Sequence, residues 1–296
     1  MTQRMVVLGD SVPWGQGLLE EHKYHTQVQA ALGSSGQVSK EVVAHSGATI
    51  GIGTRRTGQA EGEVPVSYPT IVQQCDGYTN EPDQVDLVLL NGGINDIDIR
   101  TILNPFTDTG DLSDDVEHHC YLDMKSLLAK VLDRFTRAKI VLTGYYPIFS
   151  GKSNPLRIFP FLDIHGIGFP SHFYAGPIFD KIVSLSIQFW KESDEQLARA
   201  ATESNGGAAG RVTFVPLPFT EDNSVFAGNP WLFGLTSELE AQDEVAGPRE
   251  RFCDVYYDDP LDFVSREQCY RASAGHPNVA GAKQIADAIL AVLGTA

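Results

Sequence analysis

The sequence predicts a three-layer α/β domain, in which a mainly parallel five-stranded sheet is covered by helices on both faces. Two observations lead to this prediction. Short apolar runs alternate along the chain with longer segments whose apolar residues recur at helical spacing. The short runs are also continuous, which is typical of parallel strands buried on both faces.

Each predicted element follows from its own pattern. Strands are expected at the short apolar runs 5–8, 41–45, 85–90, 139–143 and 212–215. Helices are expected over residues 19–33, 122–135 and 177–204, and from Pro277 onward. Two long segments, at about 145–176 and 216–275, are expected as irregular insertions in a single domain of residues 1–296.

Composition narrows the class of partner. The 296 residues carry a formal net charge of -16, which argues against nucleic acid because phosphate binding needs clustered Lys and Arg. The same charge favours a neutral or apolar small-molecule ligand. No apolar run is long enough for a transmembrane segment, and residues 5–8 are too few for a secretory signal. We therefore expect a cytoplasmic protein, or the mature or excised form of a secreted one.

Polar and glycine residues follow the first three predicted strands. Ser11 comes after the first, Gly47 after the second and Asn95 after the third. Because the carboxyl ends of parallel strands share one edge of a sheet, these residues are expected to meet there. Ser11 needs a base to act as a nucleophile, and His276, just before the last helix, is the candidate. The N–H groups of Ser11 and Gly47 and the Asn95 amide are candidate oxyanion donors.

Four short motifs carry a resemblance to a known family. They are GDS at 9–11, SGAT at 46–49, GGIND at 92–96 and HP at 276–277. Their order and spacing over nearly the whole chain resemble the SGNH (GDSL-type) hydrolases. The resemblance implies a flavodoxin-like sandwich that hydrolyses esters, thioesters or acetylated sugars without a metal or other cofactor.

The resemblance also implies a role for each matching residue. Ser11 would be the nucleophile and His276 the general base. The oxyanion donors would be Gly47, Asn95 and the N–H of Ser11. The expected activity is that of a serine esterase or lipase acting on carboxylic esters through an acyl-enzyme, and the apolar segment 145–176 favours apolar acyl groups. A carbohydrate (acetyl) esterase and a non-catalytic binding module are the alternatives.

One position departs from the family pattern. The family usually carries Asp three residues before the catalytic His, and Ser273 stands there. We favour a Ser–His dyad in which the Ser273 backbone carbonyl orients His276, so that Ser273→Ala should barely change the rate. An inactive protein is a second account. A displaced acid is a third, and its candidates are Asp254, Asp258, Asp259 and Asp262.

Three further patterns involve cysteine, histidine and aspartate residues. A disulfide between Cys253 and Cys269 would close a loop before the last helix, although disulfides are rare in reducing compartments. The run His118-His119-Cys120 is not expected to bind metal, because adjacent helical residues point in different directions. Asp10 and Asp96 are interpreted as structural carboxylates that accept backbone N–H bonds in turns.

Overall fold

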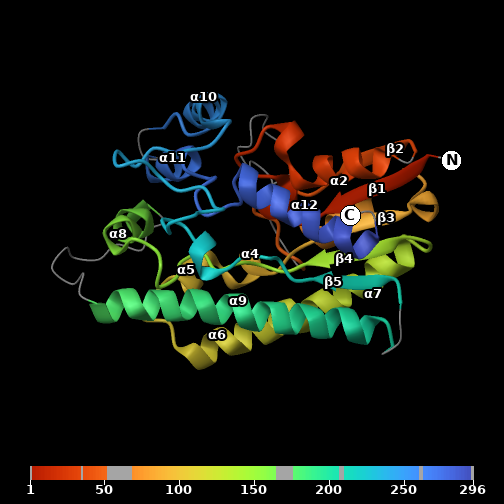
Figure 1. Ribbon diagram of the computed structural model, residues 1–296, viewed down its shortest axis with the longest axis horizontal. Helices are drawn as coiled ribbons and strands as arrows, with labels where there is room; N and C mark the ends of the chain where they lie inside the picture. The colour runs from red at the N-terminus through yellow and green to blue at the C-terminus, as the bar shows by residue number, and fades with distance from the viewer. Residues whose placement is uncertain are drawn as a thin grey trace.

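The predicted three-layer fold is confirmed by the computed structural model (Figure 1), which describes residues 2–34, 36–51, 69–164, 176–206, 210–259 and 263–294. All five strands of its sheet run parallel, in the order β2-β1-β3-β4-β5. The strands are β1 (Gln3–Leu8), β2 (Val38–Val42), β3 (Leu87–Leu90), β4 (Lys139–Thr143) and β5 (Val212–Val215).

Helices cover both faces of this sheet. On one face, α2 (Tyr24–Gly33) packs against α12 (Val279–Leu293), and on the other α7 (Met124–Arg134) packs against α3 (Ile71–Gly77) and α9 (Gly176–Ser204). The apolar residues of β1, β3 and β4 are almost fully buried between these layers. The strands are therefore rigid supports for the loops that leave their carboxyl ends.

The other elements lie in the connections. They are α1 (Ser11–Trp14), α4 (Ile94–Ile97), α5 (Ile99–Ile102), α6 (Thr109–Val116), α8 (Pro155–Ile164), α10 (Ala246–Tyr256) and α11 (Phe263–Tyr270), the 3-10 turns Glu20–His22, Pro82–Gln84 and Glu221–Asn223, and a π-helix at Glu117–Asp123. None of the described helices is both long and apolar enough to cross a lipid bilayer.

Three predicted details were wrong for local reasons. The second strand is β2 rather than 41–45, because an edge strand needs no apolar run, and its Ser39 is exposed while its other residues are half-buried. The helix expected over 122–135 begins as α7 only at Met124, and Leu122 lies in the preceding π-helix and is 48% exposed. Pro277 precedes α12, which is capped by the Asn278 side chain.

The two predicted insertions are only partly irregular. The first contains α8, and its residues 165–175 lie outside the described part of the chain. The second contains α10 and α11, joined by a disulfide between Cys253 and Cys269. Figure 1 shows α8, α10 and α11 beyond the carboxyl edge of the sheet. The described helices of both insertions therefore lie on the side where Ser11 was expected.

The strand order also fixes where a site can form. The order 2-1-3-4-5 reverses direction between β1 and β3, and ligands of such sheets bind in the crevice at that reversal. The GDS motif directly follows β1 and the GGIND motif follows β3. The two motifs thus flank the crevice.

Candidate active site

Ser11 is the first residue of α1 and is held in place by the turn before it. The Asp10 side chain caps this short helix by accepting a hydrogen bond from Val12 N–H at 2.9 Å. Gly9 has φ of 138°, and a Cβ there would lie 2.5 Å from the Asn91 carbonyl oxygen. Only glycine allows the chain to pass so close to Asn91 just after the ends of β1 and β3, and this helps to fix the direction in which Ser11 leaves the sheet.

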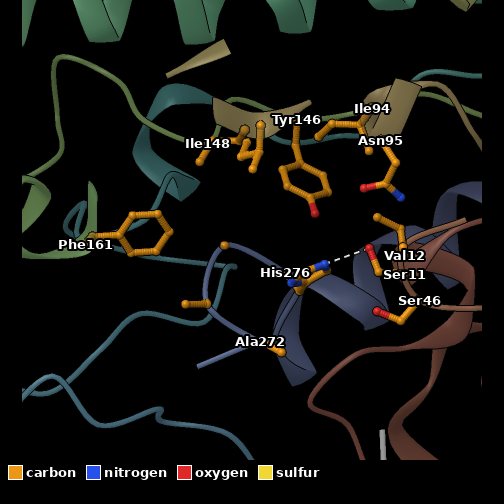
Figure 2. Close-up of a pocket in the computed structure, with 14 residues that line it drawn as sticks. Ser11, Val12, Ser46, Ile94, Asn95, Tyr146, Ile148, Phe161, Ala272 and His276 are labelled. Carbon is orange, nitrogen blue, oxygen red and sulfur yellow. Dashed lines mark hydrogen bonds between the residues drawn. The ribbon is translucent and has the colours of Figure 1, made fainter. Parts of the chain in front are cut away.

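His276 meets Ser11 from the other end of the chain. Its Nε2 lies 2.7 Å from Ser11 Oγ (Figure 2), and its Nδ1 lies 3.3 Å from the backbone carbonyl oxygen of Ser273. The second contact favours the tautomer with its proton on Nδ1, since a carbonyl can only accept. Nε2 then presents its lone pair to the Ser11 hydroxyl, as a general base requires.

The protonation state of His276 suits this role. Burial lowers the pKa of its imidazole to about 4, and the positive charge of Arg249 acts in the same direction. The hydrogen bond to Ser273 and the charge of Asp243 oppose this shift without cancelling it. His276 is therefore neutral at pH 7 and able to accept a proton.

The three expected oxyanion donors lie around the same cavity. Within the described part of the chain, the N–H groups of Ser11 and Gly47 have no protein acceptor. Asn95 donates one amide hydrogen to the Ala48 carbonyl at 3.0 Å, and its second amide hydrogen is not needed for that bond. The structure thus brings together Ser11, Gly47, Asn95 and His276, the four residues singled out from the sequence.

The cavity beside Ser11 has a volume of about 180 Å³ and a mostly apolar wall. The residues that sequence reasoning did not name individually are Val12, Ser46, Ile94, Ile99, Tyr146, Ile148, Phe161, Ala272, Ala274 and Gly275. Segment 145–176 supplies three of them, in agreement with its expected role as an apolar wall. Most of the remaining lining residues lie within or next to one of the four motifs, so the sequence could have indicated them. Nothing in the sequence indicates that Phe161 lies in the cavity.

Asp10 and Asp96 have the structural role that the sequence suggested. Asp10 also accepts from the Tyr145 hydroxyl at 2.8 Å, and Asp96 accepts from Ile50 N–H at 3.0 and 3.1 Å. Burial raises the pKa of each carboxyl to about 6. Both groups hold loops beside the cavity.

No carboxylate in the described part of the chain contacts the imidazole of His276. Of the displaced acids considered, Asp254 instead accepts from the Tyr270 hydroxyl, and Asp262 lies outside the described residues. Sequence reasoning missed Asp243, whose carboxylate accepts a hydrogen bond from the Ser273 hydroxyl. No local sequence signal links these two residues.

One argument about metal binding needs correction. His119 Nδ1 lies 2.8 Å and His118 Nε2 3.8 Å from Asp123 Oδ2. The two neighbouring histidines converge because they lie in the π-helix Glu117–Asp123, where residues four and five apart share a face. The possible ligand atoms of His118, His119 and Asp123 lie within 4.8 Å of one another, so the argument from side-chain direction was wrong.

Comparison with known proteins bears on the family and the fold of the chain. The model of the GDSL-like lipase/acylhydrolase family matches residues 7–164. An extracellular lipase from Streptomyces rimosus has a similar structure, with a TM-score of 0.54 at 16% identity, covering 99% of both chains. A phospholipase A1 from Streptomyces albidoflavus NA297 gives 0.53 at 14% identity, covering 100% of this chain and 99% of its own. No curated protein matches the sequence significantly.

At these identities the two solved structures support the fold alone, whereas the family match spans more than half of the chain and includes the first three motifs. The chain belongs to the GDSL-like lipase/acylhydrolase family, and its enzyme class is that of the ester-hydrolysing serine hydrolases.

Proposed function

We propose that the protein is an esterase or lipase that cleaves carboxylic esters with apolar acyl groups, using a dyad of Ser11 and His276. The observation that carries the proposal is the 2.7 Å contact between Ser11 Oγ and His276 Nε2. The serine needs this contact because a free hydroxyl is a poor nucleophile at neutral pH.

The first half of the reaction acylates Ser11. His276 Nε2 takes the hydroxyl proton while Oγ attacks the ester carbonyl carbon. The carbonyl oxygen becomes an oxyanion, which the N–H groups of Ser11 and Gly47 and the Asn95 amide stabilise. His276 then donates its proton to the departing alcohol, and the acyl group remains bound to Oγ.

The second half releases the acid. Water gives its proton to His276 Nε2 and attacks the acyl carbon, and the same donors stabilise the second oxyanion. The collapse of this intermediate returns the proton to Ser11 Oγ and frees the carboxylic acid. Throughout, the Ser273 carbonyl holds the Nδ1 proton, so the imidazole keeps the tautomer and orientation that both transfers need.

The cavity wall supports an apolar acyl group. Ile148 and Phe161 extend the cavity away from Ser11 (Figure 2), with Ile94 and Ile99 also in its wall. Each methylene buried there contributes about 0.8 kcal/mol. A carbohydrate acetylesterase would gain nothing from such a wall, because acetate has no chain to bury.

The test is hydrolysis of p-nitrophenyl esters from acetate to palmitate, with fluorophosphonate labelling of the same samples. We expect turnover and labelling by the wild type, with kcat/KM rising beyond acetate, and neither in Ser11→Ala. The matched control is Ser193→Ala, which changes a fully buried serine on α9 whose hydroxyl donates within its own helix to Trp190. Equal activity of Ser11→Ala and wild type would refute the proposal, and a maximum at acetate would favour the acetylesterase.

A further inference from the structure

The His276 turn, Ser273–His276, is connected to a fully buried ion pair between Asp243 and Arg249. We propose that this ion pair is a positioning device for catalysis: it fixes the Ser273 carbonyl that orients the imidazole of His276. This inference rests on the proposed function. It assigns Asp243, Arg249 and the Ser273 side chain a role in the reaction without contact with substrate.

The hydrogen bonds around the pair converge on the His276 turn. The Ser273 hydroxyl donates to Asp243, and Arg249 Nη2 lies 3.5 Å from Ser273 Oγ. Arg249 also donates from Nε and Nη2 to the Tyr270 carbonyl, at 3.2 and 3.1 Å, and from Nη1 to Asp243 Oδ1 at 3.1 Å. One guanidinium therefore holds the end of α11, the acid and the turn together.

The complete burial of the Asp243–Arg249 ion pair is poorly explained by an accidental contact. Both side chains of the pair are 0% exposed. The free energy needed to remove two charges from water can exceed the free energy gained from their attraction. An apolar pair of similar size would fill the same space without this cost. What the charged pair adds is direction, because the planar guanidinium holds its acceptors in a fixed geometry. This fixed geometry reaches the Ser273 carbonyl through the Ser273 hydroxyl, which donates to Asp243.

Packing leaves the turn little room to move. A Cβ added to Gly17 would lie 2.7 Å from Ser273 Cβ and 3.1 Å from Asp243 Cβ, so Gly17 packs close to both residues and leaves no room for a side chain. The backbone of Phe233 also holds the turn: its carbonyl accepts from Gly275 N–H at 2.9 Å, and its N–H donates to the His276 carbonyl at 2.8 Å. Phe233 holds residues 275 and 276, while the ion pair holds residue 273.

Asp243 is not a catalytic acid in this arrangement. Ser273 stands between its carboxylate and the imidazole, so Asp243 neither takes the Nδ1 proton nor touches it. The backbone carbonyl of Ser273 thus takes the place of the family's acid. Asp243 acts on the position of this carbonyl through the Ser273 side chain. Sequence reasoning expected Ser273→Ala to be nearly neutral, whereas this inference predicts a loss of activity, because the substitution removes the hydroxyl that donates to Asp243.

The decisive variant is Ser273→Ala, which removes the hydroxyl and keeps the backbone carbonyl. We expect kcat to fall about tenfold or more at nearly unchanged KM, because a small displacement of a catalytic group slows the chemical step. Ser193→Ala is the matched control and should keep the wild-type kcat. In the second pair of variants, Asp243→Asn keeps an oxygen that accepts from Ser273, so it should retain more kcat than Asp243→Ala.

A spectroscopic readout separates this inference from the proposed function. Long-range ¹H–¹⁵N NMR of His276 reports the Nδ1 tautomer without turnover. We expect a single Nδ1-protonated form in the wild type and in Ser193→Ala, and a mixture of tautomers in Ser273→Ala. Unchanged kcat or an unchanged tautomer in Ser273→Ala would overturn the inference even if the wild type is an active esterase. If the wild type hydrolyses no ester, the proposed function fails, and the tautomer alone decides the positioning role.

Discussion

His276 Nε2 lies 2.7 Å from Ser11 Oγ although 265 positions separate the two residues in the chain. The contact forms because β1 delivers Ser11 to the carboxyl edge of the sheet, while α12 starts beside that edge with the His276 turn just before it. The residues lie in elements that the core holds rigid, so the geometry is set before any substrate arrives. Predictions follow for the oxyanion donor, for the pKa of His276, for the acyl cavity and for the disulfide.

The first prediction concerns the Asn95 amide. Asn95→Ala should lower kcat by about 10²–10³-fold, the usual cost of losing one oxyanion donor. Its effect on KM should be small, because the donor matters most when negative charge develops. Steady-state kinetics on a short-chain ester measures this. The half-buried Asn104 serves as the control, since it accepts from Phe106 N–H outside the cavity. A loss of less than threefold would exclude Asn95 as a donor.

The second prediction concerns pH. Because burial lowers the pKa of His276 to about 4, kcat/KM should stay high down to pH 5 and fall as pH drops through about 4. Below that pH the imidazole is protonated and cannot act as a base. The pKa of Asp10 is raised to about 6, so the profile should also be measured for Asp10→Asn. An acid limb near pH 6 that disappears in this variant would show that Asp10, and not His276, controls the rate.

The same lowered pKa affects stability. In the unfolded chain the pKa of His276 has its ordinary value of 6.5, whereas burial lowers it to about 4 in the folded protein. Stability from this residue is therefore present above pH 6.5 and is lost as pH falls toward 4. Denaturant unfolding of wild type and His276→Gln at pH 7 and pH 4.5 should show a difference that narrows at the lower pH.

The third prediction concerns chain length. Phe161 lies across the cavity from Ser11 (Figure 2), where it limits the space for an acyl chain. Phe161→Leu should raise kcat/KM for longer acyl chains relative to acetate, by about fourfold for each further methylene that is buried, or about 0.8 kcal/mol. Phe135→Leu is the matched control, because Phe135 is also fully buried but packs against Tyr78. An unchanged chain-length profile in Phe161→Leu would show that the acyl group lies elsewhere.

The fourth prediction concerns the disulfide between Cys253 and Cys269. Replacing both by Ser should destabilise the protein by about 3 kcal/mol, because the bridge restricts the unfolded chain. Thermal unfolding with and without reductant measures this. Reductant should lower the Tm of the wild type and leave the double variant unchanged, since Cys75 and Cys120 are free. A wild-type Tm that does not respond to full reduction would contradict the prediction.

By itself, the sequence determined the layered fold and the residues at its carboxyl edge. Strand β4 was predicted at its observed limits, because a parallel strand inside the sheet is typically a mostly apolar run. Strand β5 was also predicted at its limits, from its Val and Phe residues, although it is an edge strand and Thr213 is exposed. Ser11, Gly47, Asn95 and His276 could be chosen because strand ends and short motifs are local features. Their catalytic roles remain predictions.

Only the tertiary structure decided what surrounds these residues. It showed that the Ser273 hydroxyl is anchored by Asp243 and Arg249, and that Phe161 lines the cavity. It also placed the edge strand β2 at Val38–Val42 and not at 41–45, because the polar residues of this strand give no apolar run in the sequence. Periodicity records which side of an element is buried, but it does not record which distant element packs there. The contacts of Ser273 join segments far apart in the chain, and such contacts exist only after folding brings them together.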